Sequence, residues 1–172
     1  LRCDIQRTDE LFQGWNDDSE YGSSIGLDEL IKEVKGIDVI IGGPPCQAYS
    51  IAGRVRDENG MKDDYRNFLF ESYIKVLKRY KPKMFIFENV PGILSAKPTG
   101  KVIRQSFNEA GYSLLSDLTK AIIDFTDYGV PQNRKRIIIF GVNTEYFGEK
   151  SEEIVDLFYN KYLPEYKVRD KK

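Results

Sequence analysis

The chain has 172 residues, 41% of them hydrophobic and 13% aromatic, which is enough to bury one sizeable core. It has no histidine, so histidine-based zinc sites and Ser–His or Cys–His catalysis are excluded, and we expect no metal. No apolar run approaches the roughly 18 residues that span a bilayer, so we expect no membrane segment and a soluble protein that is cytoplasmic or otherwise intracellular.

The net charge of −1 does not by itself indicate a nucleic-acid-binding domain, which is usually basic. Positive residues are nevertheless clustered, for example at Arg54 and Arg56 and again at Arg134 and Arg136. Such an asymmetric surface can still follow phosphates. The alternative is an ordinary solvated surface, because acidic residues are mixed among the basic ones.

The first predicted elements are a helix and a strand that lead into a constrained turn. A helix is predicted before Gly36 from apolar residues at helical spacing, namely Leu27, Leu30, Ile31 and Val34. An apolar strand over residues 37–41 follows it. The turn after this strand, Gly-Gly-Pro-Pro-Cys-Gln at residues 42–47, presents Cys46 on a backbone with little freedom. A nucleophile is one interpretation of this thiol, and a small buried cysteine is the other.

A long loop and a second helix come next. Residues 47–66 carry two glycines and many charges, which predicts a loop. Asn67 can then cap a helix that ends before Pro82. A buried strand over residues 84–87 leads to Glu88, so a carboxylate stands at a strand end, where open α/β sheets keep their ligand groups.

The remaining elements complete an α/β pattern. We expect a helix over residues 102–110, one or two strands within 112–124, a strand over 137–142 and a final helix over 151–162. Such alternation favours a mainly parallel sheet with helices on both faces, although the last strands are close enough in sequence to be antiparallel. We expect the charge-rich residues 144–172 to be peripheral.

The sequence resembles the DNA cytosine-5 methyltransferases in four ordered motifs. They are Pro-Pro-Cys-Gln at 44–47 followed by Ala-Tyr-Ser, Glu-Asn-Val at 88–90, Asp-Tyr-Gly-Val-Pro at 127–131 and Gln-x-Arg-x-Arg at 132–136. The resemblance covers roughly residues 1–143, which we expect to be a partial catalytic domain, with 144–172 an extension toward a target-recognition region. It implies a Rossmann-like methyltransferase fold that uses S-adenosylmethionine, with an antiparallel strand near its C-terminal end.

The resemblance also implies roles for individual residues. Cys46 would attack cytosine C6, Glu88 would stabilise charge at N3, and the loop after Cys46 would close over a flipped-out base. The implied catalytic residues are Cys46, Glu88, Arg134 and Arg136. The implied substrate-binding residues are Pro44, Gln47, Ser50, Asn89, Val90 and Gln132. The implied cofactor-binding residues are Asp4, Ile5, Pro45 and Leu69.

The resemblance leaves the family's glycine-rich cofactor turn and its central cofactor strand without a counterpart in residues 1–172. We therefore expect an internal piece of a longer enzyme that alone neither binds S-adenosylmethionine tightly nor methylates DNA. The strand over residues 37–41 would then have a free edge, covered by another chain, a rearranged N-terminal segment or a symmetry mate. Expected partners are duplex DNA and a companion restriction endonuclease. The alternatives are a tRNA methyltransferase relative and a silent scaffold.

Overall fold

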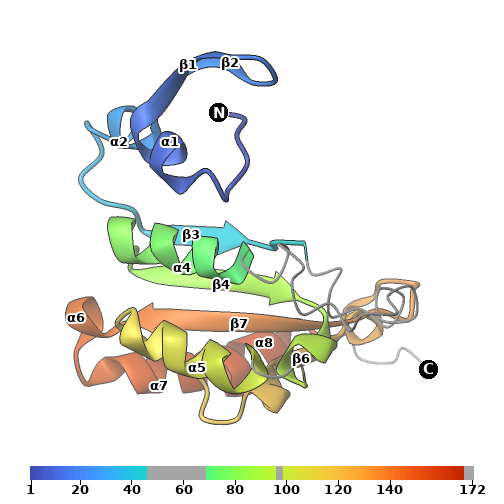
Figure 1. The fold of residues 1–172 in the computed structure, drawn as a ribbon. Helices are drawn as coiled ribbons and strands as arrows, with labels where there is room; N and C mark the ends of the chain where they lie inside the picture. Colours follow the sequence, from blue (N-terminus) through green and yellow to red (C-terminus); the bar gives the residue numbers. More distant parts are fainter. Residues whose placement is uncertain (46–68, 96–98, 169–172) are drawn as a thin grey trace.

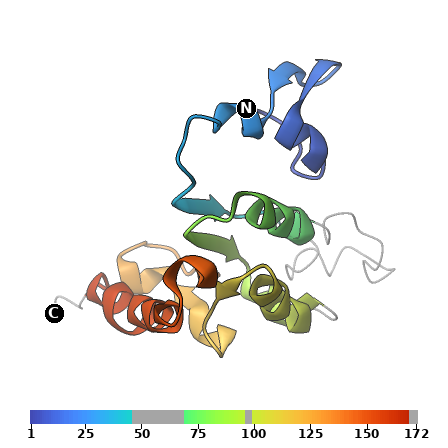
Figure 2. The same ribbon diagram turned by 90° about the vertical axis from the view of Figure 1, so that its left-hand side faces the viewer.

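The computed structural model describes residues 1–45, 69–95 and 99–168 (Figure 1). Its N-terminal unit contains the short helix α1 (Thr8–Gln13), a hairpin of β1 (Gly14–Asp18) and β2 (Gly22–Ile25), and the single turn α2 (Leu27–Leu30). This unit lies beyond one edge of the main sheet in both views (Figures 1 and 2). The helix expected before Gly36 is therefore shorter than its apolar spacing suggested.

The main sheet has five strands in the order β3-β4-β7-β5, with β6 also paired to β7. The strands are β3 (Val39–Gly42), β4 (Met84–Asn89), β5 (Tyr112–Ser113), β6 (Ile122–Asp124) and β7 (Lys135–Asn143). The pair β3 and β4 is parallel, whereas β7 is antiparallel to β4, β5 and β6. Four strands thus run one way and β7 runs against them.

The sheet is mixed, which corrects the expectation of a mainly parallel one. Because β7 lies between β4 and the pair β5 and β6, its reversed direction makes most of the hydrogen-bonded pairings antiparallel. A run of apolar residues identifies a strand but carries no information on its direction. The antiparallel strand expected near the C-terminal end is present as β7.

Helices α4 (Leu69–Tyr80) and α5 (Thr99–Glu109) cover one face of the sheet (Figure 2). Their aromatic side chains form a tight cluster with alternate residues of β4. The rings of Phe85 and Phe107 stack with centroids 4.5 Å apart, and Phe70 meets Phe107 edge-on at 5.3 Å. Burial of this cluster fixes which face of β4 points toward the core.

The opposite face is covered by the C-terminal helices. They are α6 (Thr144–Phe147), α7 (Lys150–Leu157), the π-helical turn η6 (Phe158–Tyr162) and α8 (Leu163–Glu165). Val155 and Tyr159 are buried in the core, and Phe158 stacks on Phe140 at 4.3 Å. The expectation that residues 144–172 are peripheral is therefore wrong for this helical segment, whose apolar positions complete the second layer.

Tyr159 repairs a break in the backbone pairing of β7. On the side of β7 away from β4, β5 pairs only with its end and β6 only with its start. Between them, the Tyr159 hydroxyl donates to the carbonyl of Ile138 at 2.6 Å and accepts from the N–H of Phe140 at 2.8 Å. One side chain thereby satisfies two backbone groups of β7 that neither β5 nor β6 pairs with.

Strand β3 is an edge strand in the part of the chain that the structure describes. Val39 is 42% exposed and Ile41 is 72% exposed, and the hairpin β1-β2 pairs only with itself. The predicted free edge is thus present within the described ranges. A rearranged N-terminal segment does not cover it there.

Candidate active site

Three segments that are distant in sequence meet at one end of the sheet. In the parallel pair, Gly42 lies opposite Phe87, so the Gly43–Pro44 turn runs beside Glu88 and Asn89. In the antiparallel pair, Glu88 lies opposite Ile138, so Arg136 lies just past the end of β4. Two short 3₁₀ turns follow strands of this sheet. They are η3 (Pro91–Leu94) after β4 and η5 (Phe125–Tyr128) after β6.

Glu88 and Arg136 form an ion pair at this end of the sheet. The Nε of Arg136 lies 2.9 Å from Oε1 of Glu88, and the two side chains are 20% and 37% exposed, respectively. The Nη1 of Arg136 also donates to the carbonyl of Lys135 at 2.8 Å. The guanidinium therefore orients the carboxylate, which stays open to solvent on part of its surface.

Gly43 lies directly against the Glu88 carboxylate. A Cβ atom at residue 43 would stand 2.8 Å from Oε2 of Glu88, closer than real Cβ contacts allow. A glycine here lets the backbone of the Pro-Pro turn approach the acid. The turn that leads to Cys46 therefore packs directly against the predicted acid.

Asn89 ties the same turn to β4. Its side chain is buried, its Nδ2 donates to the carbonyl of Pro44 at 3.3 Å, and its Oδ1 accepts from the N–H of Val90 at 2.8 Å. Both ends of the amide thus contact backbone. A substrate contact of Asn89 stays a prediction, and these bonds favour a role in holding the turn.

The other predicted substrate residues are placed less closely. Val90 is half-buried, and Gln132 and Arg134 are exposed on the segment that enters β7. The carbonyl of Arg134 accepts from the N–H of Phe125 at 3.0 Å, which fixes its backbone. Cys46, Gln47, Ser50 and the predicted closing loop lie outside the described residues.

The predicted cofactor residues do not come together in the described contacts. Asp4 is exposed and its Oδ1 accepts from the N–H of Gln6 at 2.9 Å, whereas Leu69 is buried at the start of α4. Pro45 is exposed three residues past the end of β3, and Ile5 is half-buried in the N-terminal unit. A role of these four residues in binding S-adenosylmethionine stays a prediction.

Tyr73 of α4 stabilises the two strands that lead into the site, a role that was not predicted from the sequence. Its hydroxyl donates to the carbonyl of Ile86 at 3.1 Å and lies 3.4 Å from that of Ile40, so it bridges β3 and β4. A Cβ at residue 42 would stand 2.6 Å from the Tyr73 ring, so this ring packs on Gly42. Burial raises the pKa of Tyr73 well above its ordinary value. A tyrosine within an otherwise apolar helix face was the available signal.

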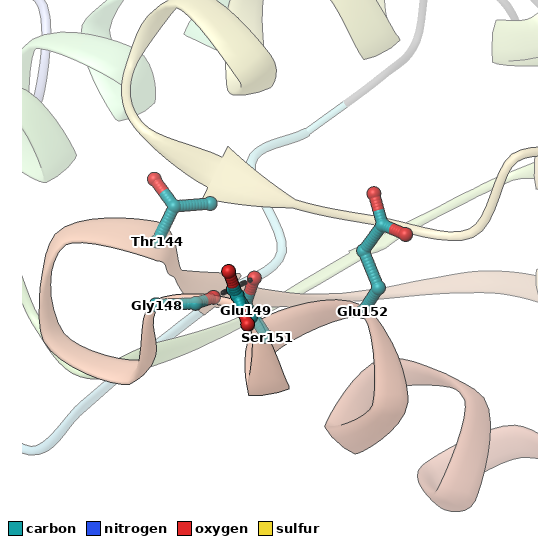
Figure 3. A pocket seen from close by; sticks show the side chains of 5 residues that line it. All are labelled: Thr144, Gly148, Glu149, Ser151 and Glu152. Atoms are coloured by element: carbon teal, nitrogen blue, oxygen red, sulfur yellow. Dashed lines mark hydrogen bonds between the residues drawn. The ribbon is translucent and has the colours of Figure 1, made fainter.

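A separate hollow of about 560 Å³ lies over α6 and α7 (Figure 3). It is lined by Thr144, Gly148, Glu149, Ser151 and Glu152. Ser151 is engaged locally, since its Oγ donates to the carbonyl of Gly148 at 2.8 Å. The hollow lies at the opposite end of β7 from Arg136, a strand length on the order of 25 Å away, and contains no predicted site residue.

In the part of the chain that the structure describes, no helix is both long and apolar enough to cross a membrane. Within the same ranges, no group of three or more histidine, cysteine, aspartate or glutamate side chains could hold a metal ion.

Comparison with known proteins identifies the family. Residues 18–170 match the family model described as C-5 cytosine-specific DNA methylase. The chain belongs to this family. The match extends past residue 143, where the motif resemblance had weakened, and so includes the C-terminal helices.

Individual relatives agree with this assignment. The chain is 51% identical over 121 residues to the type II methyltransferase M.Bpa9945I of Bacillus paralicheniformis, covering 64% of this chain and 27% of that protein. It is 33% identical over 169 residues to the orphan methyltransferase M.Rho11sI of Bacillus phage rho11s, covering 97% of this chain and 30% of the relative. The chain thus spans about a quarter to a third of these relatives.

A solved structure shares the fold. An Escherichia coli prophage protein described as a DNA modification methyltransferase aligns with a TM-score of 0.54 and 30% identity. The alignment covers 74% of this chain and 33% of that one. The α/β fold with its mixed sheet is therefore that of the methyltransferases.

Proposed function

We propose that this chain contributes the catalytic end of an enzyme that methylates carbon 5 of a flipped-out cytosine in duplex DNA. The observation that carries the proposal is the convergence of Gly43, Glu88 and Arg136 at one end of the sheet. Gly43 lies three residues before Cys46 in the sequence. Glu88, Arg136 and the start of the turn that leads to Cys46 thus lie at the same end of the sheet.

The chemistry assigned to these residues begins with the thiol. The Cys46 thiolate adds to cytosine C6, forming a sulfur–carbon bond and moving the electron pair of the C5–C6 double bond toward C5. Cytosine C5, a weak nucleophile in the free base, becomes enamine-like. S-adenosylmethionine, the methyl donor of the family, supplies an electrophilic methyl group when bound. Once C5 carries the methyl group, loss of the C5 proton to water lets the Cys46 sulfur leave C6, which restores the C5–C6 double bond and the free thiolate.

Glu88 and the arginines act on the ring while this electron pair moves. A proton held between the Glu88 carboxyl and cytosine N3 stabilises the charge that develops on the ring, a contribution of typically 10²–10⁴-fold in such systems. Arg136 keeps the Glu88 carboxylate in place through their 2.9 Å contact. Arg134, exposed at the entrance to β7, is suited to the ring O2 or a nearby phosphate, because a guanidinium matches both acceptors.

Methylation of duplex DNA requires one further step, in which the target base is rotated out of the helix. The target base has to leave the stack, at a cost of a few kcal/mol, before the thiol can reach C6.

A companion restriction endonuclease in a bacterial cytoplasm is the proposed setting. The exposed β3 edge, with Ile41 72% exposed, is proposed to be covered by a further strand of the same protein or a second chain.

The test is transfer of a tritiated methyl group by the natural protein, including any sequence outside residues 1–172. Unmethylated duplex DNA is expected to become labelled at cytosine C5, and the same DNA carrying 5-methylcytosine should take no label. Labelling of tRNA with no labelling of DNA would contradict the proposed substrate. Labelling that is unchanged in the Cys46→Ala variant would contradict the mechanism.

A further inference from the structure

The C-terminal segment returns to the turn that precedes the two arginines. After α8, the N–H of Val168 donates to the carbonyl of Asp127 at 2.8 Å. The neighbouring Lys167 Nζ lies 2.7 Å from Oδ2 of Asp127, and this contact raises the pKa of Lys167 above its ordinary value. Lys167 and Val168 together are called the strap below.

The strap lies on a turn of defined shape. The turn η5 is capped by Asp124, whose Oδ1 accepts from the N–H of Thr126 at 3.1 Å. It ends at Gly129 in the left-handed conformation, with φ of 80°. A Cβ at residue 129 would stand 3.0 Å from Cγ2 of Val168, so the strap and the turn pack with little room to spare.

This turn is bonded to the arginine segment. The N–H of Phe125 donates to the carbonyl of Arg134 at 3.0 Å, and the N–H of Val130 donates to the carbonyl of Phe125 at 3.2 Å. In the pairing of β6 with β7, Ile123 lies opposite Arg136. A continuous series of contacts therefore runs from the strap through η5 to both arginines.

We propose that Lys167 and Val168 are positioning residues that hold the arginine segment in shape before DNA binds. The inference rests on the proposed function for the identity of the substrate, but its structural part does not. A segment that is already ordered loses less conformational entropy on binding, so the effect should appear in the affinity for DNA. Arg136 is held independently by β7, so chemistry on bound DNA should change little.

A direct contact of Lys167 with a DNA phosphate would also weaken binding when the lysine is removed. The two roles predict different effects of an Asp127 substitution on DNA binding. If Lys167 binds DNA directly, Asp127→Asn removes a competing anion and leaves binding unchanged or tighter. If the strap positions the turn, Asp127→Asn loosens the same contact and weakens binding.

The experiment measures KM for DNA and kcat in the natural protein. Lys167→Ala and Asp127→Asn should each raise KM by about two- to fivefold with kcat nearly unchanged, as expected for a half-exposed pair. The double variant should be no worse than either single one, and Lys167→Asp combined with Asp127→Lys should recover part of the loss. Lys161→Ala, an exposed lysine on the same segment, is the matched control and should leave KM unchanged. An unchanged or lower KM for Asp127→Asn would overturn the proposal.

Hydrogen exchange gives a second readout that does not need activity. In Lys167→Ala, the amides of Val168, Val130 and Phe125 should exchange faster, whereas those of β4 should not change. If the natural protein fails to methylate cytosine but these amides respond, the proposed function is wrong and the positioning role stands. If the Val130 and Phe125 amides are unaffected, the strap does not hold the turn and the inference fails.

Discussion

Arg136 Nε lies 2.9 Å from Oε1 of Glu88, which joins the start of β7 to the end of β4. The two residues are 48 positions apart in sequence, and the antiparallel pairing of their strands brings them together. Strand β4 also runs beside the turn before Cys46, so the ion pair and this turn lie at the same end of the sheet.

Removing the guanidinium should impair turnover more than folding. In Arg136→Ala, Glu88 loses its charged partner, and we expect kcat to fall by about 10- to 100-fold, the size associated with a charge-assisted hydrogen bond. Arg136→Lys should recover only part of the activity, because an ammonium does not present the same planar donors. Steady-state methyl transfer measures the effect. The control Lys135→Ala, whose side chain pairs loosely with Asp124 at 3.8 Å, should remain near wild type, and equal losses in both variants would contradict the assignment.

A methyl group at residue 43 should displace the acid. In Gly43→Ala the new Cβ would meet Oε2 of Glu88 at 2.8 Å, so the carboxylate has to move away from Arg136. We expect turnover to fall by about tenfold or more while the midpoint of thermal unfolding changes little, since the turn is exposed. Full turnover in this variant would show that the position of Glu88 is unimportant or that the turn can yield.

Tyr159 offers a test of the fold that is separate from the site. Tyr159→Phe leaves the Ile138 carbonyl and the Phe140 N–H without their partner, so the free energy of unfolding should fall by about 1–3 kcal/mol. Denaturant unfolding measures this loss. Tyr162→Phe is the matched control, because Tyr162 lies on the same π-helical turn but is 49% exposed. Equal stability of the two variants would be inconsistent with the bridging role of Tyr159.

The attachment of the N-terminal unit should depend on pH through Asp28. Its carboxylate accepts from Arg79 Nε at 2.8 Å and from the Tyr80 hydroxyl at 3.0 Å, and the Arg79 contact holds the pKa of Asp28 below its ordinary value. A lowered folded-state pKa contributes stability above the unfolded-state pKa of about 3.9, and this contribution is lost as the pH falls further, through the folded-state pKa.

Asp28→Asn should therefore be less stable than wild type at about pH 6, and the difference should shrink below about pH 4. Unfolding monitored by the fluorescence of Trp15, the single tryptophan, which lies in the N-terminal unit, is the measurement. Glu29→Gln is the control, because its partner Lys32 is exposed and the pair contributes little. A stability difference that is independent of pH would exclude the ion pair as its source.

The sequence predicted the elements well and their arrangement less well. The strands around residues 39–42, 84–89 and 135–143 follow from apolar runs, and the motif resemblance implied that Glu88 and Arg136 act in the same reaction. The place of β7 between β4 and β5 and the helical second layer with Tyr159 depend on contacts between distant residues, which periodicity does not encode. The bond from Asn89 to Pro44 was equally hidden, because an asparagine in a motif is compatible with either substrate or backbone partners.

Cys46 and Glu88 are proposed to act on the same cytosine. Incubation of the natural protein with duplex DNA containing 5-fluorocytosine, in the presence of S-adenosylmethionine, tests this proposal, with the adduct mapped by mass spectrometry. We expect a stable adduct at Cys46, formed far more slowly in Glu88→Gln although this variant still folds and binds DNA. An adduct at Cys3, or the same rate of adduct formation in Glu88→Gln as in wild type, would contradict it.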